Sequence, residues 1–150
     1  MSAEWGRRLF QIGAGTLVLL GLAHSLSLFE PLTPTNATER QLLNLMTNYK
    51  FNLLGSHRTM NDLLRGFSVS FMIGALGLGL LDLLLSRERD AILKRLAMVN
   101  ALWLAANTAV SIFYFFAIPT AFLSVAFVLF ALAWLNIPAQ TPTTPGTGSR

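Results

Sequence analysis

The sequence predicts an all-α fold, an integral membrane four-helix bundle with an extra amphipathic helix between the first and second spans. Three observations predict it: an apolar composition, four long apolar segments, and an amphipathic segment after the first of them. Of the 150 residues, 53% are hydrophobic and 12% are charged, about half the charged share of an average soluble domain. The mean hydropathy of +0.56 agrees with a chain that lies mostly in lipid. The length allows one domain, which we expect over residues 1–137, followed by a disordered tail over residues 138–150.

Four segments qualify as membrane spans, because a helix needs about 20 apolar residues to cross a hydrocarbon core about 30 Å thick. They cover about residues 9–29, 66–86, 96–117 and 121–137. The last two form an almost unbroken apolar run, which as one helix would be about 63 Å long, about twice the core thickness. The run must therefore turn back. We expect the break at Ile118-Pro119-Thr120, because proline cannot continue the helical hydrogen-bond ladder.

The positions of Lys and Arg predict the orientation, since short cytoplasmic loops carry an excess of both. The basic residues that precede the first span or fill the connection between the second and third are Arg7, Arg8, Arg87, Arg89, Lys94 and Arg95. Charges in the long connection between the first and second spans are nearly balanced. We therefore expect a multi-pass protein of the inner (plasma) membrane with both termini in the cytoplasm. The net charge of +4 is read as topology information, because a nucleic-acid binder gathers its basic residues on a soluble face.

The N-terminus has a competing interpretation. Arg7 and Arg8, the apolar residues after them and Gly21-Leu22-Ala23 also fit a signal peptide with a small-residue cleavage site. The apolar stretch continues through Phe29 to full spanning length, however, and this favours an uncleaved first span. Later spans keep the same orientation in either case.

A structured segment is expected in the long outer connection. Asn36-Ala37-Thr38-Glu39 fits a capping box at a helix N-terminus. The apolar residues after it cover one half of a helical wheel and are Leu42, Leu43, Leu45, Met46, Tyr49, Leu53 and Leu54. The polar half carries amides rather than lysines. The sequence thus predicts an amphipathic helix over about residues 36–54, in the outer interface or on top of the bundle, with Gly55 as its C-cap.

Small residues recur at helical spacing in three of the spans. The sets are Gly13 and Gly21 in the first span, Gly66, Ser70, Gly74 and Gly77 in the second, and Ala97, Ala101, Ala105 and Ala109 in the third. In lipid, small residues let helix backbones approach one another closely. We expect all three sets to be packing seams between helices.

The outer side holds the first group of candidate site residues, which are His24, His57, Arg58, Asn61, Asp62 and Arg65. His24 shares the face of Gly13 and Gly21, and its structural interpretation is a neutral imidazole hydrogen-bonded across the interface, for instance to Ser111. The remaining residues form either a solvated first turn of the second span or a polar mouth with His24 beneath it. In the second case the amphipathic helix would be its lid.

The second group of candidates lies inside the spans and consists of Asp82, Asn100 and Asn107. Asp82 is expected about one turn from the inner end, where its carboxylate can reach Arg87 or Arg89, or meet Asn100. The alternative is a proton relay. Asn107 is expected near the midplane, where an amide usually bridges helices.

No known catalytic motif is present, and the lack of cysteine excludes thiolate metal sites. We expect no metal and no cofactor, although two histidines could ligate haem and a quinone would suit the same outer site. The leading function is a non-enzymatic accessory subunit or self-associating bundle whose partners are the lipid bilayer, other membrane subunits or a second copy. The rival is a small-molecule or redox protein binding quinone, haem or lipid, and the third candidate is a small transporter. Nucleic acid is not an expected partner.

Two short motifs carry a resemblance to known proteins. Gly21-Leu22-Ala23-His24 lies in the first span, and Arg-Thr-Met-Asn-Asp-Leu-Leu-Arg-Gly-Phe-Ser, from Arg58 to Ser68, leads into the second. With four short spans, the chain resembles small bacterial four-span membrane proteins and, distantly, the DoxX-like group. The resemblance covers Leu9 to Ile137. It implies an inner-membrane protein and transfers no catalytic residue.

Overall fold

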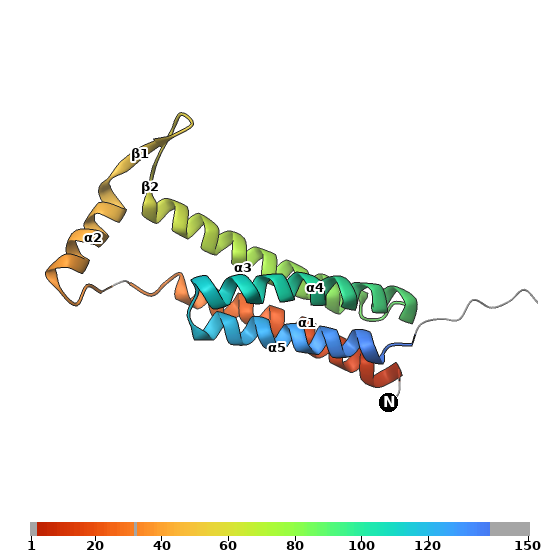
Figure 1. The fold of residues 1–150 in the computed structure, drawn as a ribbon. Coiled ribbons are helices and arrows are strands. Elements are labelled where there is room, and N and C mark those ends of the chain that lie inside the picture. The colour runs from red at the N-terminus through yellow and green to blue at the C-terminus, as the bar shows by residue number, and fades with distance from the viewer. Residues whose placement is uncertain (1–2, 32, 139–150) are drawn as a thin grey trace, which may run out of the picture. The chain divides into compact units, whose positions relative to one another are not determined.

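The computed structural model describes residues 3–31 and 33–138, and these form five helices and one two-stranded hairpin (Figure 1). In chain order the elements are α1 (Ala3–Ser27), α2 (Ala37–Asn48), β1 (Lys50–Leu53), β2 (Ser56–Thr59), α3 (Met60–Leu85), α4 (Asp90–Tyr114) and α5 (Ala117–Asn136). Within the described residues, α1, α3, α4 and α5 are long and apolar enough to cross a membrane. The all-α prediction is thus confirmed. Apart from Pro138, the predicted tail lies outside the described residues.

Three of the four long apolar helices begin about six residues before the predicted spans, at Ala3, Met60 and Asp90. Apolar length marks the part of a helix that suits lipid, whereas the helix itself starts where the first turn is capped. For α3, the Thr59 hydroxyl accepts from the Asp62 N–H at 3.1 Å, and the Asp62 carboxylate accepts from the Thr59 N–H at 3.0 Å. This reciprocal pair is a capping box, and it places the helix start well before the apolar segment.

The turn between α4 and α5 lies three residues before the predicted break. Phe115 and Phe116 have extended backbones, with ψ of 173° and 175°, and α5 begins at Ala117. Pro119 therefore lies in the first turn of α5, where a helix leaves its N–H groups without intrahelical acceptors and a missing N–H costs nothing. The proline starts the second helix rather than ending the first. Figure 1 shows α4 and α5 side by side after this turn.

The amphipathic helix α2 is shorter than predicted. Its start is confirmed, since the Asn36 side chain accepts from the Glu39 N–H at 2.9 Å. The Thr35 N–H and hydroxyl donate to the Glu39 carboxylate at 2.6 and 2.8 Å, and they hold the pKa of that carboxyl below its usual value. The helix ends at Asn48 rather than at residue 54. From Tyr49 the apolar residues alternate instead of following the helical period, which suits a strand.

The residues after α2 form an antiparallel hairpin in which Lys50 pairs with Thr59 and Leu53 with Ser56. Gly55 is a turn residue of this hairpin, so the predicted helix C-cap is wrong. Leu54 and Gly55 have φ of 50° and 88°, and two positive φ angles are typical of the type I′ turn that suits the strand twist. Glycine adopts such angles freely, whereas for an L-residue the left-handed conformation costs about 1–2 kcal/mol.

Contacts divide the chain into two compact units, one of residues 1–17 with 79–150 and one of residues 18–78. In the first unit, Phe10 of α1 meets Phe130 of α5 edge to face, with ring centroids 5.0 Å apart. A Cβ on Gly13 would lie 3.1 Å from the Phe130 ring, so a larger residue here would require the ring to shift by a few tenths of an ångström. The alanine seam of α4 is confirmed at Ala97 and Ala101, which are buried. Ala105 is half-buried and Ala109 is exposed, so the predicted seam does not extend to Ala109.

In the second unit, α1 packs closely on α3. A Cβ on Gly21 would lie 2.6 Å from the side chain of Leu76 and 3.1 Å from its backbone nitrogen, which confirms Gly21 as a seam residue. The predicted seam of α3 is different. Its members, which we call the open face, are Gly66, Ser70, Gly74 and Gly77, and all four are exposed. Apart from the helix's own nearby backbone, no described atom lies within 4 Å of a Cβ position built on Gly66, Gly74 or Gly77, so the prediction of an internal seam is wrong.

Candidate functional site

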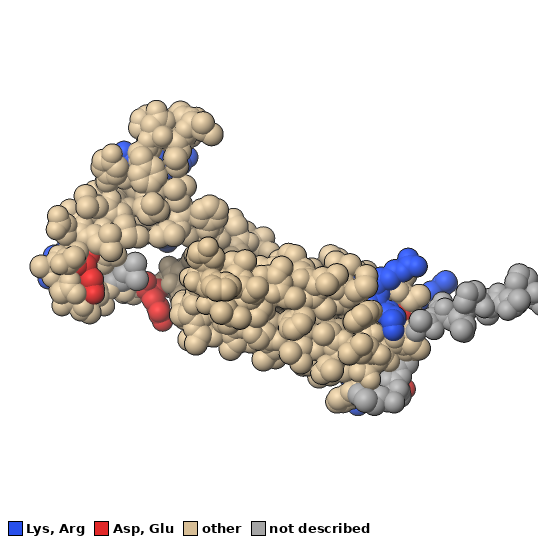
Figure 2. Space-filling model, in the orientation of Figure 1, with Lys and Arg blue, Asp and Glu red and all other residues tan. Residues whose placement is uncertain are grey.

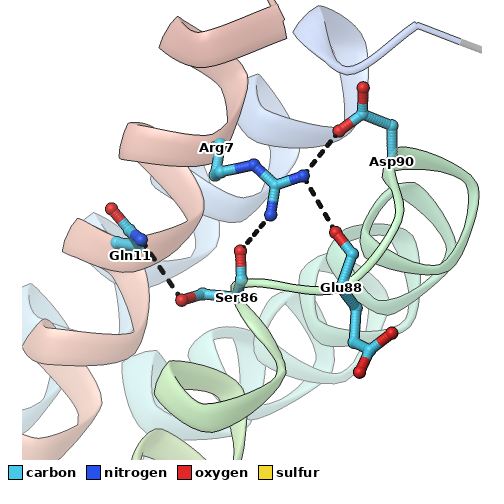
Figure 3. Close-up of polar contacts among 5 residues, drawn as sticks. All are labelled: Arg7, Gln11, Ser86, Glu88 and Asp90. Carbon is cyan, nitrogen blue, oxygen red and sulfur yellow. Dashed lines mark hydrogen bonds and ion pairs between the residues drawn. The ribbon is translucent and has the colours of Figure 1, made fainter.

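The densest polar cluster of the first unit lies around Arg7 (Figure 3). The Arg7 guanidinium donates to the backbone carbonyls of Ser86 and Glu88, the second at 2.8 Å. It also pairs with the Asp90 carboxylate at 2.8 Å. Beside it, Gln11 Nε2 donates to the Ser86 hydroxyl at 3.2 Å. One side chain of α1 thereby binds the end of α3, the connecting residues and the start of α4.

This cluster caps the end of a helix. The last carbonyls of a helix have no intrahelical donors, and a cation there also meets the negative end of the helix dipole. Lys94 acts in the same way on α5, where its ammonium donates to the Ile137 carbonyl at 2.6 Å. Four other basic residues at this end are exposed, namely Arg8, Arg87, Arg89 and Arg95, and Figure 2 shows Lys and Arg gathered there.

The Arg7 cluster was not predicted from the sequence, because all of these charges were interpreted as topology signals. The position of Arg7 on a helical wheel indicates that it shares the packed face of α1. At 100° per residue, Arg7 lies about 60° from Phe10 and about 20° from Ala14, whereas Arg8 lies on the other side of the helix. Since Phe10 and Ala14 are fully buried, Arg7 shares the packed face of α1.

Asp82 and Asn100 form a buried polar pair within the first unit. The Asn100 amide donates to the Asp82 carboxylate at 2.8 Å, and the two residues are only 2% and 5% exposed. Of the partners considered from sequence, the structure thus brings Asn100 to Asp82, while Arg87 and Arg89 are exposed. A buried polar group is costly unless it is hydrogen-bonded, and this pair meets that requirement between α3 and α4.

Two further polar side chains of α4 bind within α4 or across the turn to α5. The Asn107 amide donates to the Trp103 carbonyl of its own helix at 2.9 Å. Ser111 and Thr120 hydroxyls lie 2.7 Å apart and join α4 to α5. Among the described residues, the Thr108 hydroxyl is buried with no hydrogen-bond partner. The partner suggested for His24, Ser111, is therefore engaged elsewhere.

His24 lies against Phe71 in the second unit, with ring centroids 5.0 Å apart in an edge-to-face arrangement. Its Nε2 is buried and has no hydrogen-bond partner in the described part of the chain. Phe71 lies about three turns into α3, whereas His57 is on β2, before that helix begins. The structure therefore does not bring His24 and His57 together, and a mouth lined by both is not formed.

The other candidates of this group lie around the start of α3. Asp62 is engaged in the capping box with Thr59, while His57, Arg58 and Arg65 are exposed and Asn61 is half-buried. Their arrangement agrees with the solvated first turn considered from sequence.

No three His, Cys, Asp or Glu residues gather as a possible metal site within the described residues. Comparison with known protein families, with curated proteins and with solved structures gives no match to this chain.

The Asp82–Asn100 pair yields a testable prediction. Replacing Asp82 with Ala leaves the buried Asn100 amide without its acceptor, and we expect a loss of about 1–3 kcal/mol in the free energy of unfolding. Asp82→Asn keeps an acceptor oxygen and should unfold close to wild type. Asn107→Ala is the control, because its amide binds only its own helix. Thermal unfolding in detergent measures all three. An Asp82→Asn variant as unstable as Asp82→Ala would show that the carboxylate charge, rather than the hydrogen bond, is what matters.

Proposed function

We propose that this chain is a non-enzymatic multi-pass protein of the inner membrane that acts by associating with a second copy of itself through the open face of α3. The resemblance to small bacterial four-span proteins supports the location. Four apolar helices of spanning length support the multi-pass arrangement. Many of the polar side chains on these helices bind one another or cap helix ends, as Arg7, Asp82 and Ser111 do, and this favours a structural use of them.

The proposed topology has both termini in the cytoplasm and the hairpin outside. It is supported by the exposed arginines between α3 and α4, since cytoplasmic loops carry an excess of positive charge. The opposite ends of α4 and α5 carry exposed aromatic residues, including Tyr114 and Phe116, as expected of a membrane interface.

Reporter fusions test this topology. We expect fusions after Ser86 and at the C-terminus to report a cytoplasmic position, and one inserted near Asn48 to report an external position. A cytoplasmic signal near Asn48 would contradict the positive-inside argument.

The observation that carries the self-association is a contrast between two helices. On α1, Gly13 and Gly21 are covered by Phe130 and Leu76. On α3, a Cβ on Gly66 or Gly74 would meet no described atom within 4 Å beyond the backbone of its own helix, although the two glycines recur at the same spacing of eight residues.

A lipid-facing helix gains little from glycine, which costs about 1 kcal/mol relative to alanine in a helix interior. Small residues four apart permit close backbone approach of another helix in lipid. The sequence Gly66-x-x-x-Ser70-x-x-x-Gly74 has this spacing along more than two turns. Flanking residues such as Phe67 and Ile73 are exposed and would surround such a contact. A second copy is the partner that is always present, and a face shared by two identical helices suits a twofold contact.

Energy transfer between donor- and acceptor-labelled chains in lipid vesicles tests the association. We expect transfer that rises with the protein-to-lipid ratio, and a dissociation constant about tenfold higher for Gly74→Leu, equivalent to about 1.4 kcal/mol. Gly15→Leu is a matched control, because Gly15 also has no described atom within 4 Å but lies on α1. Equal transfer in the two variants, or wild-type transfer no greater than random mixing gives, would contradict the proposal.

A further inference from the structure

The hairpin of the second unit has one apolar face and one polar face. Paired residues of an antiparallel hairpin share a face, and successive residues alternate between faces. Tyr49, Phe51 and Leu53 therefore fall on one face, and the Tyr49 and Phe51 ring centroids lie 6.2 Å apart. Lys50, Asn52, His57 and Thr59 fall on the other. The apolar face is largely uncovered, since Tyr49 is exposed by 62% and Leu53 by 42%.

Leu54 at the hairpin tip is fully exposed and left-handed, with φ of 50°. Asparagine, aspartate and glycine are the residues favoured at this position of a type I′ turn. The turn is held by the Gly55 N–H, which donates to the Asn52 side chain at 2.8 Å. A leucine here is unfavourable for the backbone and is exposed to water, so its side chain calls for an apolar environment outside the described chain.

Helix α2, which immediately precedes the hairpin, also exposes apolar side chains. None of its residues is buried, and its exposed apolar residues include Leu42 and Leu45. Helix and hairpin thus each carry uncovered apolar side chains.

The covalent connections of the hairpin determine what lies near this surface. β2 ends at Thr59, and α3 begins at the next residue. With 26 residues, α3 is about 39 Å long, which exceeds the hydrocarbon core of about 30 Å and approaches the bilayer thickness of about 40–45 Å including headgroups. A spanning α3 thus begins at headgroup depth, and the base of the hairpin, where β2 joins α3, lies at the same depth.

We propose that the hairpin lies in the outer membrane–water interface with its apolar face and Leu54 inserted among the lipids. This inference rests on the membrane insertion in the proposed function. The lipid surface is the occupant because the hairpin begins at its depth, and Tyr49 suits an interface that favours amphipathic rings. Arg58 pairs with Phe51 on the apolar face, and its long side chain can extend to the headgroups.

Site-directed spin labelling tests this insertion directly, because the chain has no cysteine. Single labels at Leu54→Cys, His57→Cys and Ile73→Cys would be measured in the full chain, reconstituted into phosphatidylcholine vesicles at a low protein-to-lipid ratio, so that the proposed self-association does not cover residue 73. The readout is the accessibility of each label to oxygen, which concentrates in lipid, and to a water-soluble nickel chelate. His57 is the matched control, since it is exposed on the polar face of the same hairpin. Ile73 is exposed near the middle of α3 and reports whether that helix spans.

We expect the label at residue 54 to favour oxygen over the nickel chelate, as the label at residue 73 does, and the label at residue 57 to show the reverse. Nickel accessibility at residue 54 equal to that at residue 57 would overturn the inference. Protection of residue 54 from both reagents would also overturn it, and would indicate a protein contact instead. If residue 73 is open to the nickel chelate, the proposed membrane insertion itself fails, so the two failures are distinguishable.

Discussion

The arrangement of the first unit depends on how Arg7 satisfies the connection between α3 and α4. This connection is short, from residue 86 to residue 89, and it leaves helix-terminal carbonyls that need donors. The guanidinium provides several donors in a fixed fork, and it binds the Ser86 carbonyl at the end of α3, the Glu88 carbonyl within the connection and the Asp90 carboxylate. Because Arg7 belongs to α1, the same contacts fix that helix against the turn. Phe10 and Gly13, one and two turns further along, then meet Phe130 of α5.

The same requirement explains the polar residues deeper in the apolar helices. Asp82 and Asn100 satisfy one another across α3 and α4, and Ser111 and Thr120 do so across the turn from α4 to α5. His24 is different, because its buried Nε2 has no partner in the described chain and its ring rests on Phe71. In apolar surroundings a satisfied pair holds two helices in register, while an unsatisfied nitrogen is costly.

Much of this fold follows from the sequence because the signals are local. Apolar length predicted the four long helices, and Asn36 with Glu39 predicted the start of α2. The hairpin was missed because Tyr49, Leu53 and Leu54 also fit a helical wheel, and only their change of period revealed the strand. Pro119 was assigned to the wrong side of a turn, since proline suits a first helical turn as well as a break. Wheel positions showed that Gly66 and Gly74 share a face, but a single chain's sequence does not say what covers it. For the candidate site, Asp82 and Asn100 could be paired by depth, whereas the role of Arg7 depended on where the next helix begins.

A comparison of Arg7→Gln with Arg8→Gln tests the central claim most directly. The two variants remove the same charge from adjacent positions, so any effect on membrane orientation is matched, but Arg8 is exposed and outside the cluster. Arg7 and Asp90 are each 29% exposed, which leaves the pair partly screened by solvent. We therefore expect Arg7→Gln to lower the free energy of unfolding in detergent by about 1–3 kcal/mol, and Arg8→Gln to leave it nearly unchanged. Equal free energies of unfolding for the two variants would contradict the claim that Arg7 holds the α3–α4 connection to α1.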